Sequence, residues 1–287
     1  MSRFAVYMLL CVMALFAPRD VEAGPWTKQT GQLYVKLSEG FFLSNAFIDA
    51  QGKLQTGTDY FGATTSVYFE AGLPFGFQVL GYVPYTISRN SFSNGAWYMH
   101  GTTADSFFGL QYTPPVRLPL PMAARVEVKI PMYDLDRLPR AVGARANNFP
   151  AVGDGQIDVT GWFSIGGGIP NTPLYAFAEL GYRFRTEAFV GALPASDQRS
   201  FLDSGLFFTQ LGWTFWPQKR WMAMLTVHGL LPFGEDVYTK GYIVTALQVY
   251  LPIYEGWAFE ASFDPIVWAR NSAQSFQVFS VGISYSR

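Results

Sequence analysis

The last fourteen residues, 274–287, have the sequence QSFQVFSVGISYSR and decide the fold. From Gln277 to Tyr285 every second residue lies on one largely apolar face, and the residues between them are mostly small or polar. This period of two is typical of a β-strand. A final strand leaves unpaired backbone groups at a sheet edge unless another strand covers it. Residues 32–38 alternate in the same way, so we expect a barrel that closes where its first and last strands pair.

The composition is that of a membrane β-barrel. Lys and Arg total 20 and Asp and Glu total 21, which gives a net charge of −1 and no nucleic-acid signature. Charged residues make up only 14%, against ~25% in soluble domains. Aromatic residues reach 17%, and there are 28 glycines. Barrel strands meet lipid with every second side chain, so their hydrophobicity is spread thinly along the chain.

The N-terminus predicts a secretory signal peptide over residues 1–23, followed by the barrel over residues 24–287. Arg3 gives a positive start, and residues 4–17 form an apolar run. This run is shorter than the ~20 residues that a membrane-spanning helix needs, which disfavours the alternative of a signal anchor. Cys11, the only cysteine, lies inside the run, so the mature chain can form no disulfide and no cysteine metal site.

Alternation recurs along the whole chain and predicts an all-β fold, a transmembrane antiparallel β-barrel of about twelve strands. The expected strands are residues 32–42, 59–73, 77–88, 105–113, 123–130, 156–165, 174–185, 205–216, 221–231, 242–251, 257–264 and 274–287. Long and short connections alternate between them, as loops and turns do in outer-membrane barrels. The long connections are expected at residues 45–58, 89–103, 131–154, 187–203, 232–240 and 265–273. Aromatic residues such as Tyr112, Trp213 and Tyr285 gather near the short turns and predict an interfacial girdle.

A secreted β-sandwich is the main alternative architecture. Its inner face would have to be dry. Arg125, Glu127 and Lys129 share one face of a predicted strand, and a soluble core could not enclose all three. A polar barrel lumen can hold them, which favours the membrane barrel.

Charged residues on the inward face are the candidate functional residues. The predicted lumen-lining residues are Lys36, Glu70, Asp105, Arg125, Glu127, Lys129, Asp158, Glu179, Arg183, Arg185, His228 and Glu260. Both signs occur, so we expect ion pairs across the lumen. Two interpretations stay open: a salt-bridge network that stiffens a narrow barrel, or a solute path whose charges set its selectivity.

No enzyme is expected. Barrel lipases place a Ser close to a His, but neither His100 nor His228 has a Ser two residues later. The sequence therefore predicts no catalytic residue, cofactor site or metal site.

Several short segments resemble Gram-negative outer-membrane barrels that are loosely grouped with phenol-degradation-pathway (meta-pathway) outer-membrane proteins. They are residues 24–27 (GPWT), 68–73 (YFEAGL), 81–85 (GYVPY), 178–183 (AELGYR) and 231–234 (LPFG). The resemblance implies a barrel in the outer membrane and uptake of small or hydrophobic solutes. It supplies no catalytic residues.

We expect an outer-membrane channel or transporter for small solutes, hydrophobic ones included. The alternatives are a plugged structural or surface-interaction barrel and, third, a lipid-modifying outer-membrane enzyme. The expected partners are outer-membrane lipids, lipopolysaccharide, the barrel-assembly machinery through the C-terminal strand, and a small solute, with no nucleic acid.

Overall fold

A computed structural model describes residues 27–115, 120–133, 150, 153–189, 201–236 and 239–287. The predicted signal peptide and most of the expected loop 131–154 lie outside these residues. Among the residues described, no helix is both long enough and apolar enough to cross a bilayer.

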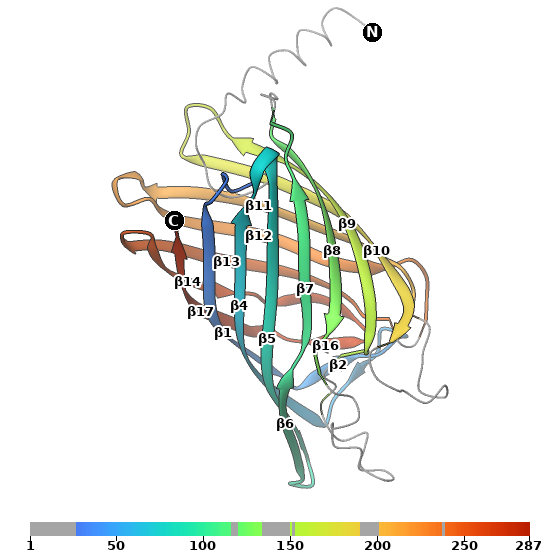
Figure 1. Cartoon of the computed structure of the whole chain (residues 1–287). Coiled ribbons are helices and arrows are strands. Elements are labelled where there is room, and N and C mark those ends of the chain that lie inside the picture. The colour runs from blue at the N-terminus through green and yellow to red at the C-terminus, as the bar shows by residue number, and fades with distance from the viewer. Residues whose placement is uncertain (1–26, 116–119, 134–149, 151–152, 190–200, 237–238) are drawn as a thin grey trace, which may run out of the picture.

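Within the described residues, twelve strands close into an antiparallel barrel (Figure 1). In chain order they are β1 (Leu33–Ser44), β4 (Thr58–Gly72), β5 (Phe77–Phe92), β7 (Asp105–Tyr112), β8 (Met122–Pro131), β9 (Gln156–Gly168), β10 (Leu174–Phe189), β11 (Ser204–Trp216), β12 (Trp221–Pro232), β13 (Gly241–Tyr254), β14 (Trp257–Phe263) and β17 (Gln277–Ser286). Each strand pairs with the next of these in the chain, so the barrel forms by simple up-and-down meander. The predicted number of strands is confirmed.

The first and last strands form the seam, as the alternation predicted. Pairing runs from Tyr34 opposite Ser286 to Leu43 opposite Gln277. Beyond the ladder, Leu33 and Arg287 exchange two backbone hydrogen bonds of 2.9 Å. Closure leaves no bare edge in the barrel wall.

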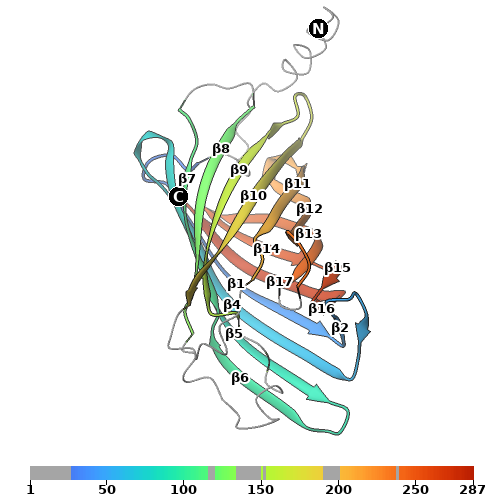
Figure 2. The same cartoon turned by 90° about the vertical axis from the view of Figure 1, so that its right-hand side faces the viewer.

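Three expected loops contain further strands, which corrects the sequence prediction. Residues 89–103 are largely a hairpin, since β5 continues to Phe92 and β6 (Trp97–Thr103) pairs back on it. This hairpin projects well beyond the neighbouring strands (Figure 1). Within residues 45–58 and 265–273, β2 (Ala46–Ile48), β3 (Leu54–Gln55), β15 (Ile266–Arg270) and β16 (Ser272–Gln274) form short strands. Figure 2 shows β2, β15 and β16 together at one end of the barrel. These strands are only two to five residues long, which is too short for alternation to identify them.

The barrel strands are tilted (Figure 2), and many large apolar side chains are exposed on their outer face, in keeping with a lipid-facing belt. On β17, Phe279, Val281 and Ile283 are exposed outward, while Ser284 is buried inward. Exposed aromatic side chains gather near the short turns: Phe75, Tyr112, Trp213, Trp216, Tyr254 and Trp257. Tyr112 and Trp213 of the predicted girdle are among them, whereas Tyr285 is only partly exposed.

Glycines on the barrel wall make room for aromatic rings of the neighbouring strand. At four glycines a Cβ would lie less than 3.0 Å from the ring of the aromatic residue directly opposite in the ladder: Gly81 with Phe69, Gly181 with Trp162, Gly212 with Tyr175, and Gly229 with Phe207. A Cβ on Gly212 would lie 1.9 Å from the Tyr175 ring, so only glycine fits there. Rings that cover glycines shield the backbone and fix how the strands align.

Candidate functional site

The barrel interior contains a cavity of about 1250 Å³, which we call the short-turn cavity. Its polar lining includes Lys36, Glu70, Arg125, Glu179 and Glu260, all of which were predicted to face the lumen. These residues come from β1, β4, β8, β10 and β14, so charged groups line most of its circumference. Turn residues after β11 and β13, among them Lys219 and Glu255, place it at the end of the barrel that carries the short turns.

Glu260 is the centre of one polar group in this cavity. Lys36 Nζ lies 2.7 Å from one carboxylate oxygen of Glu260, and the Tyr34 hydroxyl donates a hydrogen bond of 2.5 Å to the other. Lys36 and Tyr34 project from β1 and Glu260 from β14, with β17 between them. Nearby on β4, the Tyr68 hydroxyl donates to Glu70 at 2.6 Å.

Arg125 is the centre of a second group. Its guanidinium lies 3.3 Å from Glu179, 3.9 Å from Glu127 and 5.0 Å from the centroid of the Trp162 ring. Ser164 donates a further hydrogen bond of 2.6 Å to Glu179. Planar guanidinium groups combine stacking with carboxylate binding, so Arg125 is held in one orientation while it faces the cavity.

Ion pairs run along the wall, which differs from the pairing across the lumen that the sequence suggested. Arg125 on β8 reaches Glu179 on β10, and Lys36 on β1 reaches Glu260 on β14. In each pair a single strand separates the partners, because inward side chains of alternate strands lie within reach of each other. The centre of the lumen is therefore not bridged by these pairs.

An aromatic row on β10–β12 lines the same interior and was missed by sequence reasoning. Phe177 stacks on Phe208 at 5.3 Å between ring centroids, and Phe208 stacks on His228 at 5.9 Å. Phe177 and Phe208 line the short-turn cavity. The signal was present in the alternation, since Phe177 shares its face with Glu179, but only the charged residues and His228 of the inward face were predicted as lumen lining. His228 is thus placed in an aromatic stack.

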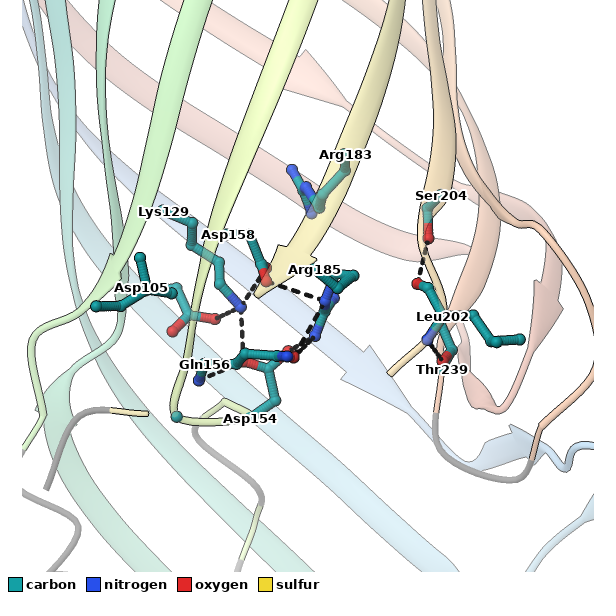
Figure 3. A network of polar contacts seen from close by, with 12 residues as sticks. Asp105, Lys129, Asp154, Gln156, Asp158, Arg183, Arg185, Leu202, Ser204 and Thr239 are labelled. Carbon is teal, nitrogen blue, oxygen red and sulfur yellow. Dashed lines mark hydrogen bonds and ion pairs between the residues drawn. The ribbon is translucent and has the colours of Figure 1, made fainter. Parts of the chain in front are cut away.

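A second cluster, which we call the long-loop cluster, surrounds Lys129 (Figure 3). Lys129 Nζ lies 2.6 Å from Asp154, 2.8 Å from Asp158 and 3.7 Å from Asp105. Arg185 pairs with Asp154 and, at 3.0 Å, with Asp158. These groups lie where β7 and β9 begin and β8 ends, at the end opposite the short turns.

Three central side chains of the long-loop cluster are buried, while those of Asp105 and Asp154 are partly exposed. The side chains of Asp158, Lys129 and Arg185 are 0%, 4% and 6% exposed. Beside them Arg183 donates to Thr160 at 3.2 Å and lies over the Phe107 ring at 5.7 Å. Paired acids and bases of this burial hold strands together more than they attract solutes.

Asp154 was not among the predicted site residues, because it precedes β9 in an expected loop. Burial acts to raise the pKa of Asp154, but Lys129 and Arg185 outweigh it and hold the pKa below its ordinary value. Among the described residues, no group of three His, Cys, Asp or Glu side chains is arranged to hold a metal ion.

Comparison with known proteins gives a fold but no family. No family model matches the chain. No curated protein matches it either. Among solved structures, the COG4313 outer membrane channel from Pseudomonas putida F1 superposes with a TM-score of 0.68 at 8% identity, over 93% of this chain and 100% of that one. The chain therefore has the β-barrel fold of that outer-membrane protein.

A porin named NanC also superposes on this barrel, with a TM-score of 0.53 at 8% identity. That alignment covers 88% of this chain and 98% of NanC. At such low identity the likeness concerns the barrel alone, and no residue of the two lumens can be matched.

Proposed function

We propose that this protein is a passive outer-membrane channel for small solutes. One observation carries the proposal: a closed barrel encloses a cavity of about 1250 Å³ whose wall bears charges of both signs. Its polar pairs run along the wall and leave the middle of the lumen to solute and water. The fold likeness to proteins named as a channel and a porin supports this function.

The lining favours solutes that are partly apolar. Phe177 and Phe208 line one side of the short-turn cavity, and Tyr34 and Tyr68 line the other side. The strands that carry them, β10 and β11 against β1 and β4, lie opposite each other in the strand order. Rings on two walls bind apolar surface, while Arg125 beside them can orient a polar group.

A plugged barrel is the second candidate function, because the centre of the long-loop cluster is buried. Lys129, Asp158 and Arg185 close their part of the wall to water. A barrel blocked at that end would serve as a structural or surface-interaction protein.

Conductance in planar lipid bilayers tests the proposal. A channel gives steady ion current, and Arg125→Ala changes the size of that current because it removes a charge from the cavity wall, whereas Lys129→Ala breaks the buried long-loop cluster instead. Val126→Ala is the matched control, since Val126 lies between them in sequence but faces outward. Silent bilayers that contain correctly folded protein would favour the plugged barrel.

The proposal extends to targeting and partners. Residues 1–23 act as a cleaved signal peptide, which leaves residues 24–287 to form the barrel. Lipid and lipopolysaccharide surround the apolar belt, and β17 engages the barrel-assembly machinery. N-terminal sequencing of the protein from outer membranes checks the cleavage site.

A further inference from the structure

The outer surface carries a carboxylate at mid-height in its apolar belt. Glu39 is near the middle of the twelve-residue strand β1. Because ~9–11 residues of a tilted strand cross the hydrocarbon layer, Glu39 lies far from both membrane interfaces. On the adjoining strands β4 and β5, the outward charges Asp59 and Arg89 lie instead towards the ends near the long loops.

The orientation of Glu39 follows from its neighbours. On the same strand, Lys36 and Ser38 make inward contacts to Glu260 and Ser66. Glu39 is an odd number of residues away from both Lys36 and Ser38, so its side chain points to the opposite face of the strand. It pairs in the ladder with Val281, which is 45% exposed on the outer face. Glu39 therefore points towards lipid.

Hydroxyl groups lie beside this carboxylate. Thr65 on β4 is opposite Glu39 and donates a hydrogen bond of 2.5 Å to its Oε2. Tyr85 on β5 is opposite Thr65 and is 47% exposed. We call Glu39, Thr65 and Tyr85 the Glu39 patch.

A carboxylate in hydrocarbon is costly, by ~2.5–3.5 kcal/mol for an Asp on an insertion scale. Thr65 supplies one donor, and lipid tails supply none. Such intramembrane acids usually have a polar partner. The patch itself contains what a partner would need, because it combines an acceptor with two hydroxyl donors.

We propose that the Glu39 patch is the contact face for a second copy of this chain. In a two-fold interface the same surface meets itself. Thr65 lies between Glu39 and Tyr85. When two patches face each other across a two-fold axis, the Glu39 carboxylate of one copy therefore lies on the side where the other copy has its Tyr85 hydroxyl. Leu37, Val67 and Val281 surround the polar centre with apolar contact surface. This interface does not depend on whether the lumen conducts.

Disulfide cross-linking in phosphatidylcholine vesicles tests the proposal with the full-length mature chain. Cys11 is the only natural cysteine and lies within the predicted signal peptide, so introduced cysteines report cleanly. Val67→Cys lies next to Thr65 on the outer face without disturbing the Glu39–Thr65 contact. Leu211→Cys is the control, since it is similarly exposed on β11, on the opposite side of the strand ring. We expect several-fold more cross-linked dimer from Val67→Cys.

Substitution of Glu39 provides the second measurement. Adding Glu39→Leu to Val67→Cys should weaken dimerisation about tenfold, whereas Glu39→Gln, which still hydrogen-bonds, should retain most of it. Heat-dependent mobility on gels verifies that each variant is folded. Equal cross-linking of Val67→Cys and Leu211→Cys would overturn the proposal, and so would a dimer that Glu39→Leu leaves unchanged.

Discussion

At the scale of single residues, Asp154 supplies much of the negative charge that balances the bases of the long-loop cluster. Asp154 contacts both Lys129 and Arg185. Its depressed pKa means that its stabilising contribution is present above the unfolded pKa of ~3.9. The contribution is lost as the pH falls through the still lower pKa of the folded state.

Asp154→Asn should therefore lower the free energy of unfolding at neutral pH by about 1–3 kcal/mol, because bonds to charged groups are lost. It should also flatten the fall in stability on acidification below pH ~4. Thermal unfolding in detergent between neutral and acidic pH measures both effects. Asp59→Asn is the control, since Asp59 is exposed near the start of β4. An unchanged acid profile in Asp154→Asn would contradict the prediction.

Substitution of Gly212 tests the steric fit between aromatic rings and the glycines opposite them. Gly212→Ala places a methyl group on the Tyr175 ring and should displace its hydrogen bond to Gln210. Overpacking of this kind costs about 1–3 kcal/mol. Gly161→Ala should change stability by less than ~0.5 kcal/mol, because a Cβ there meets no atom within 4 Å. Comparing the denaturant midpoints of the two variants decides the matter, and similar losses would refute it.

Among the structural elements, the seam strand β17 completes the closure of the barrel. It pairs with β1 on one side and β14 on the other, so its backbone groups are used on both edges. A proline inside such a strand removes a ladder hydrogen bond and is found essentially only at edges.

Ile283→Pro should prevent barrel closure, whereas Ile283→Ala should lose only part of an outward apolar contact. The readout is the heat-modifiable gel mobility of refolded protein. If Ile283→Pro folded as well as Ile283→Ala, the seam would not be essential for closure.

Strand positions could be predicted where one face meets lipid and the other faces the lumen. The pairing of residues 32–38 with the C-terminal strand followed from the need to cover an edge. The hairpin of β5 and β6 could not be predicted, because beyond the membrane both of its faces can be wet. Asp154 was missed for a related reason: its role comes from the fold, which brings the residue before β9 against Lys129 and Arg185.

At the scale of the whole molecule, acids outnumber bases along the described strand walls and the long-loop end, while Lys28, Lys219, Arg220 and Arg287 add bases at the short-turn end of the cavity. The acids are Glu70, Asp105, Glu127, Asp154, Asp158, Glu179, Glu260 and Asp264, and the bases are Lys36, Arg125, Lys129, Arg183 and Arg185. Which residues face inward could be predicted from alternation, but their pairing could not, because it depends on the stagger between strands.

The open channel should prefer K⁺ to Cl⁻, because rings of acidic side chains favour cations. Reversal potentials in a KCl gradient measure this preference. Glu179→Gln with Glu260→Gln should move the potential towards anions, while Glu39→Gln on the outer surface should leave it unchanged. A shift of equal size in the double variant and in Glu39→Gln would show that the inward acids do not set selectivity.

The fit of rings over glycines has a consequence for assembly. Sliding one strand by two residues would keep apolar side chains outward and polar ones inward, so patterning alone would permit the error. After such a slip the Tyr175 ring would lie opposite Gln210 or Thr214 instead of Gly212, and either side chain would occupy the space that the ring needs. The rings of Trp162, Phe69 and Phe207 lie over glycines in the same way at three other strand pairs. A barrel with misaligned strands would lose this steric fit, so the fit selects the correct register.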